Sequence, residues 1–286
     1  MTRARFTKGH GTENDFVLVP DLDGTLGLTA ERSRRLADRR AGIGGDGVIR
    51  VVPTAHADEP AIRELAAAAT WFMDYRNADG SIAQMCGNGT RVFAAYLDRE
   101  GLAPDGDFAI ATRAGLKYVR RVAAGYAVGI GRAVVDEAGQ ARTTGGIAMV
   151  ATAGAGELPG VRVDVGNPHT VVLLPAGQRL ADVDLTEPPR VAPTPAEGTN
   201  VEFVQVLGPG HLAMRVHERG VGETRSCGTG AVAAAAAVRW WHGPDPDPTE
   251  WIVDVPGGRL TVRFTAADGA ELAGPAALVA DGETDL

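Results

Sequence analysis

The chain has 286 residues, of which 44% are hydrophobic, so it can form one large or two modest domains with a real core. Its formal net charge of −8 argues against a nucleic-acid or anionic-membrane surface, because a broadly acidic face would repel either partner. The first residues lack the apolar stretch of a signal peptide, and no segment approaches the roughly 20 apolar residues that span a bilayer. We therefore expect a cytoplasmic protein that acts on a small molecule.

Short β-like runs dominate the chain and predict an α+β fold with much antiparallel sheet. Four strand candidates alternate or carry β-branched residues and are bounded by Gly, Pro or Asn, at 14–19, 70–75, 161–165 and 251–255. A helix is predicted from Thr29 to Arg40, with Thr29 as its cap and Gly42 just beyond its end. The alanine-rich segment from Ala55 to Ala69 predicts a surface insertion with helical tendency.

Two further helices are each predicted to begin immediately after a cysteine. The segment that starts at Met85 and Cys86 matches the one that starts at Ser226 and Cys227: a cysteine, Gly, a small polar residue and Gly precede a run that favours a helix. The match is an internal repeat, and it predicts two similar halves.

The two cysteines, the only ones in the chain, allow three interpretations: buried apolar fillers, a disulfide, or a reactive pair. A reducing cytoplasm disfavours the disulfide. At a helix start, free N–H groups and the helix dipole stabilise a thiolate and can also receive a substrate carboxylate. Two cysteines in duplicated settings favour the reactive pair over the fillers.

A symmetric pair of thiols suits the inversion of a carbon centre. Inversion needs a base on one face of the carbon to take its proton and an acid on the other face to return one. Two cysteines from two similar domains would supply one thiolate and one thiol, and their roles would exchange with the direction of the reaction. Which cysteine is the resting thiolate stays open.

Six ordered segments along the chain carry a family resemblance. They are Lys8–Phe16, Asn77–Gly80, Met85–Gly89, Gly166–His169, Thr199–Val201 and Glu218–Gly230. Together they resemble the successive signatures of the diaminopimelate epimerase family. The resemblance implies a cofactor-independent isomerase that interconverts LL- and meso-2,6-diaminopimelate, in the biosynthesis of lysine and peptidoglycan precursors.

The resemblance also assigns site residues. It implies that Cys86 and Cys227 are the acid/base pair, with His169 and Glu218 close to the reacting centre. The polar contacts to a substrate with two amino-acid ends fall on Asn14, Asn77, Gly87, Asn88, Asn167, Asn200, Glu218, Arg219, Gly228 and Thr229. Neutral asparagines suit such a zwitterion, because they replace water without adding charge.

The fold implied by the resemblance is two similar α+β domains, each a curved and mostly antiparallel sheet around a central helix, with the active site in the cleft between them. We expect an N-terminal domain at 1–124, to which 273–286 return as a final strand, and a C-terminal domain at 125–272. A homodimer is implied by the family alone. Closure of the cleft would exclude water from the site.

The sequence departs from the family pattern at two positions. Glu13 stands where the common motif has glycine, and Gly47 stands where some members have a substrate-contacting glutamine. Each departure puts a local contact in doubt, but neither touches a catalytic group.

Other functions remain open. No lysine in an evident pyridoxal context, no phosphate-binding loop and no metal-ligand spacing is found, so we expect neither a cofactor nor a metal. The alternatives are another cofactor-independent racemase of the same fold, such as a proline racemase-like enzyme, a thiol redox protein, and a non-catalytic binder. The chain lacks the Cys-x-x-Cys motif that the redox hypothesis would favour, and the set of asparagines argues against proline as the substrate.

Overall fold

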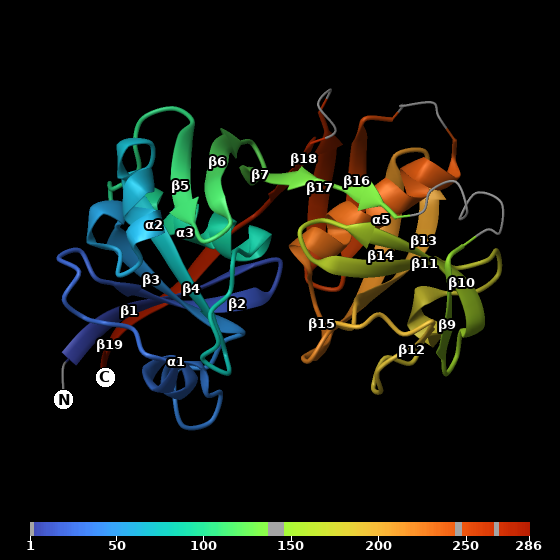
Figure 1. The fold of residues 1–286 in the computed structure, drawn as a ribbon, viewed down its shortest axis with the longest axis horizontal. Coiled ribbons are helices and arrows are strands. Elements are labelled where there is room, and N and C mark those ends of the chain that lie inside the picture. Colours follow the sequence, from blue (N-terminus) through green and yellow to red (C-terminus); the bar gives the residue numbers. More distant parts are fainter. Residues whose placement is uncertain (1–2, 137–145, 244–247, 266–268) are drawn as a thin grey trace. The chain divides into compact units, whose positions relative to one another are not determined.

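The computed structural model describes residues 3–136, 146–243, 248–265 and 269–286. Its contacts divide the chain into two compact units (Figure 1). Unit 1 comprises residues 1–129 and 273–286, and unit 2 comprises residues 130–272. Among the described residues, no helix is long and apolar enough to cross a membrane.

Unit 1 is built on a mixed sheet in which each strand pairs with the next. The order is β19 (Ala277–Asp285), β1 (Arg3–Gly11), β2 (Asn14–Pro20), β3 (Gly47–Pro53), β4 (Trp71–Asn77), β5 (Phe108–Thr112), β6 (Gly115–Val122) and β7 (Gly125–Arg132). The pairs β2–β3 and β4–β5 are parallel, and the others are antiparallel. The C-terminal strand β19 therefore closes the unit by pairing with β1.

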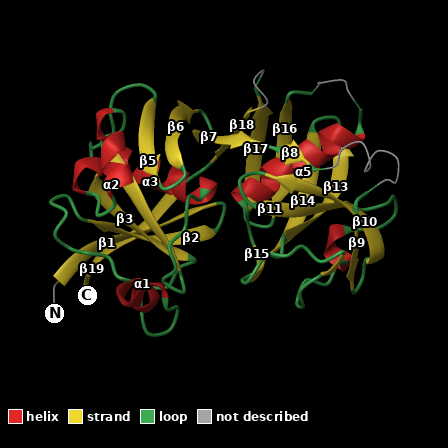
Figure 2. Ribbon diagram, in the orientation of Figure 1, coloured by secondary structure: helices red, strands yellow, loops and turns green. Residues whose placement is uncertain are grey.

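Helix α3 (Gly87–Arg99) is the central helix of unit 1 and packs against β1, β2, β3 and β19 (Figure 2). Its apolar residues Val92, Phe93 and Leu97 are fully buried. Burial of this face stabilises the helix far more than its intrinsic propensity does, because an isolated helix of this length is marginal in water.

Helix α1 (Ala30–Ala37) is capped by Thr29, as predicted, but it ends three residues before Arg40. The prediction was wrong at this end because Asp38 leaves the helical region and its carboxylate accepts hydrogen bonds from the N–H groups of Arg40 and Ala41, at 2.7 and 2.8 Å. Asp side chains commonly compete with the helix in this way.

The alanine-rich segment forms three short helical turns, η1 (Thr54–His56), α2 (Pro60–Arg63) and η2 (Glu64–Ala67). Three of its apolar side chains are buried against β3, β4 and β5, namely Ala57, Ile62 and Ala69. The predicted helical tendency is confirmed and most of the segment is exposed, but these three side chains belong to the core of unit 1.

Unit 2 repeats the same path. Its main strands are β8 (Val134–Val135), β9 (Ala148–Thr152), β10 (Gly156–Asp164), β11 (Pro168–Leu173), β12 (Arg190–Ala192), β13 (Asn200–Gly208), β14 (His211–Glu218), β15 (Gly222–Thr224), β16 (Glu250–Val255), β17 (Gly258–Phe264) and β18 (Gly269–Gly274), with the 3-10 turn η3 (Leu180–Asp182). Strand β10 pairs antiparallel with β8, β9 and β11. The pairs β11–β13 and β14–β16 are parallel. The pairs β13–β14 and β16–β17 are antiparallel.

The two units share one series of strand pairs, to which unit 2 adds β8, β9, β12 and β15. In the order just given, the senses from β1 to β6 recur from β10 to β17, and helix α5 (Gly228–Trp241) follows β14 as α3 follows β4. Helix α5 packs against β10, β11, β13 and β14. The predicted α+β class with two similar halves is confirmed, and the four predicted strands lie on β2, β4, β10 and β16.

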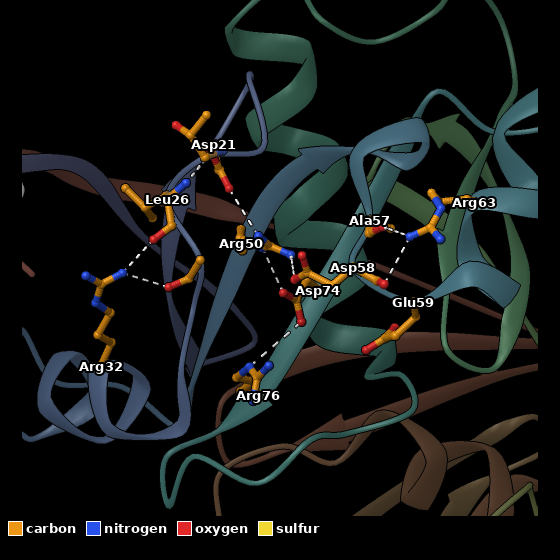
Figure 3. Close-up of polar contacts among 12 residues, drawn as sticks. Asp21, Leu26, Arg32, Arg50, Ala57, Asp58, Glu59, Arg63, Asp74 and Arg76 are labelled. Carbon is orange, nitrogen blue, oxygen red and sulfur yellow. Dashed lines mark hydrogen bonds and ion pairs between the residues drawn. The ribbon is translucent and has the colours of Figure 1, made fainter.

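One charge network in unit 1 centres on the buried side chains of Arg50 in β3 and Asp74 in β4 (Figure 3). The guanidinium of Arg50 donates to Asp74, Asp21 and Asp58 at 2.8, 3.2 and 2.7 Å, and Arg113 donates to Asp74 at 2.7 Å. Arg50 and Asp74 are directly opposite one another in the β3–β4 register. Such a network fixes the register of the two strands, since loss of one partner would leave a buried charge.

Candidate active site

Cys86 caps the central helix of unit 1. Its backbone is extended, with φ −141° and ψ 122°, and its Sγ accepts a hydrogen bond from the N–H of Gly89 at 3.4 Å. The thiol lies at the positive end of α3, where a thiolate is stabilised and where the N–H groups of the first turn are oriented toward an anion.

A polar network joins Cys86 to two of the predicted asparagines. The Oδ1 atom of Asn14 lies 3.7 Å from the Sγ of Cys86 and accepts a hydrogen bond from Asn88 Nδ2 at 3.2 Å. Asn14 Nδ2 donates to Asp46 Oδ2 at 2.6 Å. Because Asp46 can only accept while ionised, this bond turns the carbonyl of Asn14 toward the thiol.

Arg91 fixes the other end of this network. Its Nη2 donates to Asn88 Oδ1 at 2.7 Å and to Thr12 Oγ1 at 3.3 Å. An arginine has no acceptor, so the amide of Asn88 must present its carbonyl to Arg91 and its NH₂ group to Asn14. The orientation of both amides is thereby set by one cation and one anion.

The turn between β1 and β2 is strained. Thr12 and Glu13 both have positive φ angles, 51° and 63°, in a region that favours glycine. Glycine would relieve this strain at position 13, which gives a physical reason for the family pattern from which Glu13 departs. The turn also places the hydroxyl of Thr12 on Arg91.

Cys227 caps α5 in the same manner. Its φ and ψ are −122° and 117°, and its Sγ accepts from the N–H of Gly230 at 3.3 Å and lies 3.6 Å from Thr229 Oγ1. Only 6% of Cys227 is exposed, whereas Cys86 is half-buried. Neither cysteine forms a disulfide, so each half provides one reduced cysteine at a helix N-terminus.

A histidine and a glutamate lie side by side beneath α5. His169 Nδ1 lies 2.6 Å from Glu202 Oε1, and both side chains are fully buried. His169 Nε2 lies 3.1 Å from Asn167 Oδ1. The contacts on both ring nitrogens fix the plane of the imidazole.

Three more predicted residues, Asn200, Glu218 and Arg219, lie at the start of β13 and the end of β14. Asn200 Oδ1 accepts from the backbone N–H of Arg219 at 3.0 Å, and Asn200 Nδ2 donates to the carbonyl of Pro168 at 3.3 Å. Glu218 accepts a hydrogen bond from the hydroxyl of Thr224. These contacts tie the ends of β11, β13 and β14 together next to the start of α5.

The electrostatic surroundings of Cys227 favour the neutral thiol. Burial raises the pKa of Cys227 well above its ordinary value of 9.0, and the carboxylates of Glu218 and Glu202 raise it further. Hydrogen bonds from Thr229 and Gly230 act in the opposite direction. Desolvation and two negative charges together exceed these two bonds.

Comparisons with known proteins agree with this geometry. The family model described as diaminopimelate epimerase matches residues 6–135 and 161–279. The diaminopimelate epimerases of Streptomyces coelicolor and Thermobifida fusca are 49% and 48% identical, over 99% of this chain and 96% and 98% of their own lengths. The chain belongs to the diaminopimelate epimerase family. The predicted membership and isomerase class are confirmed.

Solved structures share the fold at low sequence identity. A phenazine biosynthesis protein of Bacillus anthracis aligns with a TM-score of 0.69 at 17% identity, covering 100% of both chains. A hydroxyproline epimerase of Agrobacterium vitis aligns with a TM-score of 0.62 at 14% identity, covering 98% of this chain and 92% of the other. The epimerase fold is thus common to proteins with different names.

Not every residue that the family resemblance assigned joins a thiol network. Asn77 is the last residue of β4, and its side chain donates to Ser81 Oγ at 3.0 Å. The guanidinium of Arg219 is exposed and donates to the carbonyl of Glu197. The backbone N–H groups of Gly87 and Gly228 open their helices, as the repeat predicts.

The second departure from the family pattern has a steric reason. A Cβ built on Gly47 would lie 2.5 Å from the ring of Tyr75 and 2.6 Å from the carbonyl of Arg76. A glutamine would therefore need the Tyr75 ring and the β4 backbone to shift. In this chain the position supports close packing of β3 on β4 and offers no side-chain contact.

Four residues of the networks were missed from the sequence: Thr12, Asp46, Arg91 and Glu202. Two of them carried a signal, because Arg91 is a charge on the buried face of a helix and Glu202 interrupts a buried apolar strand. Buried charges mark functional sites or paired structural groups. In the part of the chain that the structure describes, no three His, Cys, Asp or Glu side chains gather as metal ligands would.

Proposed function

We propose that this chain interconverts LL- and meso-2,6-diaminopimelate by two-base proton transfer between Cys86, Cys227 and one α-carbon, without a cofactor. The observation that carries the proposal is the duplicated placement of a reduced cysteine as the cap of a central helix in each unit. The matching epimerases, at 48–49% identity over nearly their whole lengths, support diaminopimelate as the substrate.

In the proposed reaction one thiolate takes the α-proton and becomes a thiol, and the electron pair of the broken C–H bond stays on the α-carbon. The other thiol then protonates the opposite face of that carbon and becomes the thiolate. Protons and charge balance, and the two cysteines exchange roles in the reverse direction. The proposal requires the two thiols to approach one α-carbon from opposite faces.

The helix N-termini have a second role in this proposal. Negative charge develops next to the substrate α-carboxylate as the proton leaves, and the N–H groups of the first helical turns can stabilise it. Asn88 and Thr229 lie in those turns, after Gly87 and Gly228. Exclusion of water would strengthen each of these interactions.

We assign supporting roles to the remaining residues. His169 and Glu218 hold the protonation state around Cys227, with Glu218 acting directly on the thiol pKa. Asn14, Asn77, Asn167, Asn200 and Arg219 are proposed to bind the amino and carboxylate groups of the substrate. A zwitterion with two amino-acid ends needs many paired donors and acceptors.

We further propose a cytoplasmic homodimer that binds no nucleic acid and serves the biosynthesis of lysine and peptidoglycan precursors. The net charge of −8 supports the exclusion of nucleic acid, and the names of the matching proteins support the biosynthetic role. Light scattering at micromolar concentration would measure the oligomeric state, and a monomer would overturn that part.

The function is tested by proton NMR of the reduced protein in D₂O with LL-diaminopimelate and, separately, with L-proline. We expect loss of the α-proton signal and formation of the meso isomer from diaminopimelate only. The same assay on Cys86→Ala should show neither. Turnover of proline in place of diaminopimelate would show that proline is the substrate. Absence of α-proton exchange with either compound would refute the proposal.

A further inference from the structure

The two half-sites differ in the side chains that pack against the third helical residue after each cysteine. In unit 1, a Cβ built on Gly89 would lie 2.9 Å from Met73 Cε, 3.3 Å from Ile49 Cδ1 and 3.4 Å from Phe16 Cε1. In unit 2, a Cβ on Gly230 would lie 2.7 Å from Glu202 Oε1 and 3.2 Å from Cys227 Sγ. The first turn of α3 therefore packs against apolar groups, and the first turn of α5 packs against a carboxylate.

Strand register shows that these are equivalent positions of the repeat. The parallel pair β2–β3 begins with Phe16 opposite Gly47, and β11–β13 begins with His169 opposite Asn200. Ile49 and Glu202 each lie two residues further along the second strand. The buried pair of His169 and Glu202 therefore occupies the place that Phe16 and Ile49 occupy in unit 1.

The two helices also differ in buried charge, but here the charged residue lies in unit 1 and is a cation. Arg91 is the fifth residue after Cys86 and is fully buried, and Val232 is the fifth residue after Cys227 and is fully buried too. Unit 1 thus holds a buried cation where unit 2 holds an apolar group, and unit 2 holds a buried carboxylate where unit 1 holds an apolar group.

Arg91 is oriented but not neutralised by a carboxylate. Its Nη2 is bound to Asn88 and Thr12, while Nε and Nη1 are buried without a hydrogen-bond partner in the described ranges. Burial lowers the pKa of Arg91 to about 10, and the charge of Cys86 acts against that lowering. Because attraction is mutual, the same charge favours the thiolate form of Cys86.

Glu202 is anchored by one oxygen only. Its Oε1 is bound to His169 Nδ1 at 2.6 Å, while Oε2 is buried and has no hydrogen-bond partner among the residues described. A second negative charge next to this carboxylate would be repelled in a medium of low dielectric constant. Glu202 therefore opposes a thiolate at Cys227.

Resting on the function proposed above, we propose that Arg91 and Glu202 are positioning residues that polarise the thiol pair, so that in the free protein Cys86 is the thiolate and Cys227 the thiol. The substrate isomer whose α-proton faces Cys86 then meets a ready base and a ready acid. The other isomer needs the proton to move between the thiols first.

Most of the other groups that face the two thiols agree with this assignment. The carbonyl oxygen of Asn14 opposes it, because it can only accept a hydrogen bond and so favours the protonated form of Cys86; the proposal requires the charge of Arg91 to exceed this effect. Around Cys227, Glu218 adds to the effect of Glu202, and only the bonds from Thr229 and Gly230 favour a thiolate. On the Cys86 side, Asp46 is the nearest carboxylate of the network, and its Oδ1 is bound to Arg39 Nη2 at 2.7 Å. Arg39 also binds the neighbouring Asp15, which Lys8 binds as well, so two cations offset these two carboxylates.

The test is the rate of alkylation of each thiol by iodoacetamide as a function of pH, followed by mass spectrometry of the two tryptic peptides that hold the cysteines. Only a thiolate reacts, so the midpoint of each profile reports ionisation, while accessibility changes the amplitude alone. We expect the midpoint of Cys86 to lie at least about two pH units below that of Cys227.

Two variants separate the contributions. Arg91→Met should raise the midpoint of Cys86 by about one pH unit or more and leave that of Cys227 nearly unchanged, and Arg91→Lys should restore it. Glu202→Gln, which keeps the shape of the side chain, should lower the midpoint of Cys227 by about one pH unit. The matched controls, Arg99→Met on the same helix and the exposed Glu250→Gln, should shift neither midpoint.

Equal or reversed midpoints in the unmodified protein would overturn the proposal, and so would an unchanged Cys86 midpoint in a folded Arg91→Met variant. Circular dichroism checks folding; if Arg91→Met does not fold, the unmodified profiles and Glu202→Gln still decide. Alkylation needs no substrate. The charge assignment can therefore fail while diaminopimelate is turned over, and the proposed function can fail while the midpoints follow the prediction.

Discussion

The start of α3 and the start of α5 have the same backbone but different chemical surroundings. Each is capped by a cysteine that accepts a hydrogen bond from the N–H three residues later, at 3.4 and 3.3 Å. Beneath α3 lie Phe16 and Ile49, whereas beneath α5 lie His169 and Glu202. The repeated backbone places two thiols in the same way, whereas the buried side chains near them differ in charge and, in the proposal above, determine which thiol is ionised.

The largest expected effect is the loss of either thiol. Cys86→Ala and Cys227→Ala should each lower epimerisation by a factor of about 10²–10⁴, because proton transfer on one face then lacks its acid or base. The measurement is the initial rate of meso-diaminopimelate formation. Cysteine-to-serine variants are the shape-matched controls and should also be slow, since a hydroxyl is a poorer base; residual activity near that of the unmodified protein would contradict the account.

The two helix glycines should respond differently to alanine. Gly230→Ala would push its methyl group against a buried carboxylate oxygen and the Cys227 sulfur, and the resulting displacement should reduce kcat by as much as about 10²-fold. Gly89→Ala would meet the flexible end of Met73, and alanine favours the helix by about 1 kcal/mol, so activity should change little. The measurement is kcat from steady-state kinetics, and equal kcat values for the two variants would contradict the predicted difference.

Stability at alkaline pH should also separate the half-sites. Because the pKa of Cys227 is raised in the folded protein, the unfolded chain ionises first, so stability is complete below pH 9.0 and falls as the pH rises above it. Urea unfolding at pH 7 to 10.5 should show a steeper loss for the unmodified protein than for Cys227→Ala. Parallel curves would mean that the buried thiol is not perturbed.

The smallest effect is expected at the strained turn of unit 1. Glu13→Gly removes a side chain from a residue at φ 63° and should stabilise the protein by about 1 kcal/mol, with activity unchanged. Urea unfolding at pH 7 measures it, and Glu100→Gly, at a helix end with ordinary φ, is the control that should not stabilise. A destabilised Glu13→Gly variant would show that the turn is not strained at this residue.

The sequence predicted the cysteines at helix starts, the capping Thr29 and four strands because each rests on a local pattern. It did not predict the contact of Asn14 with Asp46, which depends on the parallel pairing of β2 and β3 across 26 intervening residues of chain. The roles of Arg91 and Glu202 were also out of reach, since both follow from burial against other elements. The sequence therefore predicted the local surroundings of the two thiols, but not the contacts of the buried charged residues that act on the thiol pKa values.

The most direct test of two-base catalysis by Cys86 and Cys227 is the isotope content of substrate and product in the first turnovers in D₂O. A thiol that exchanges with solvent delivers deuterium, so the account predicts that every new meso molecule carries deuterium at the inverted carbon while remaining LL-diaminopimelate keeps its proton. A single base would return part of the original proton to the product and place deuterium in unreacted substrate, and that result would contradict the account.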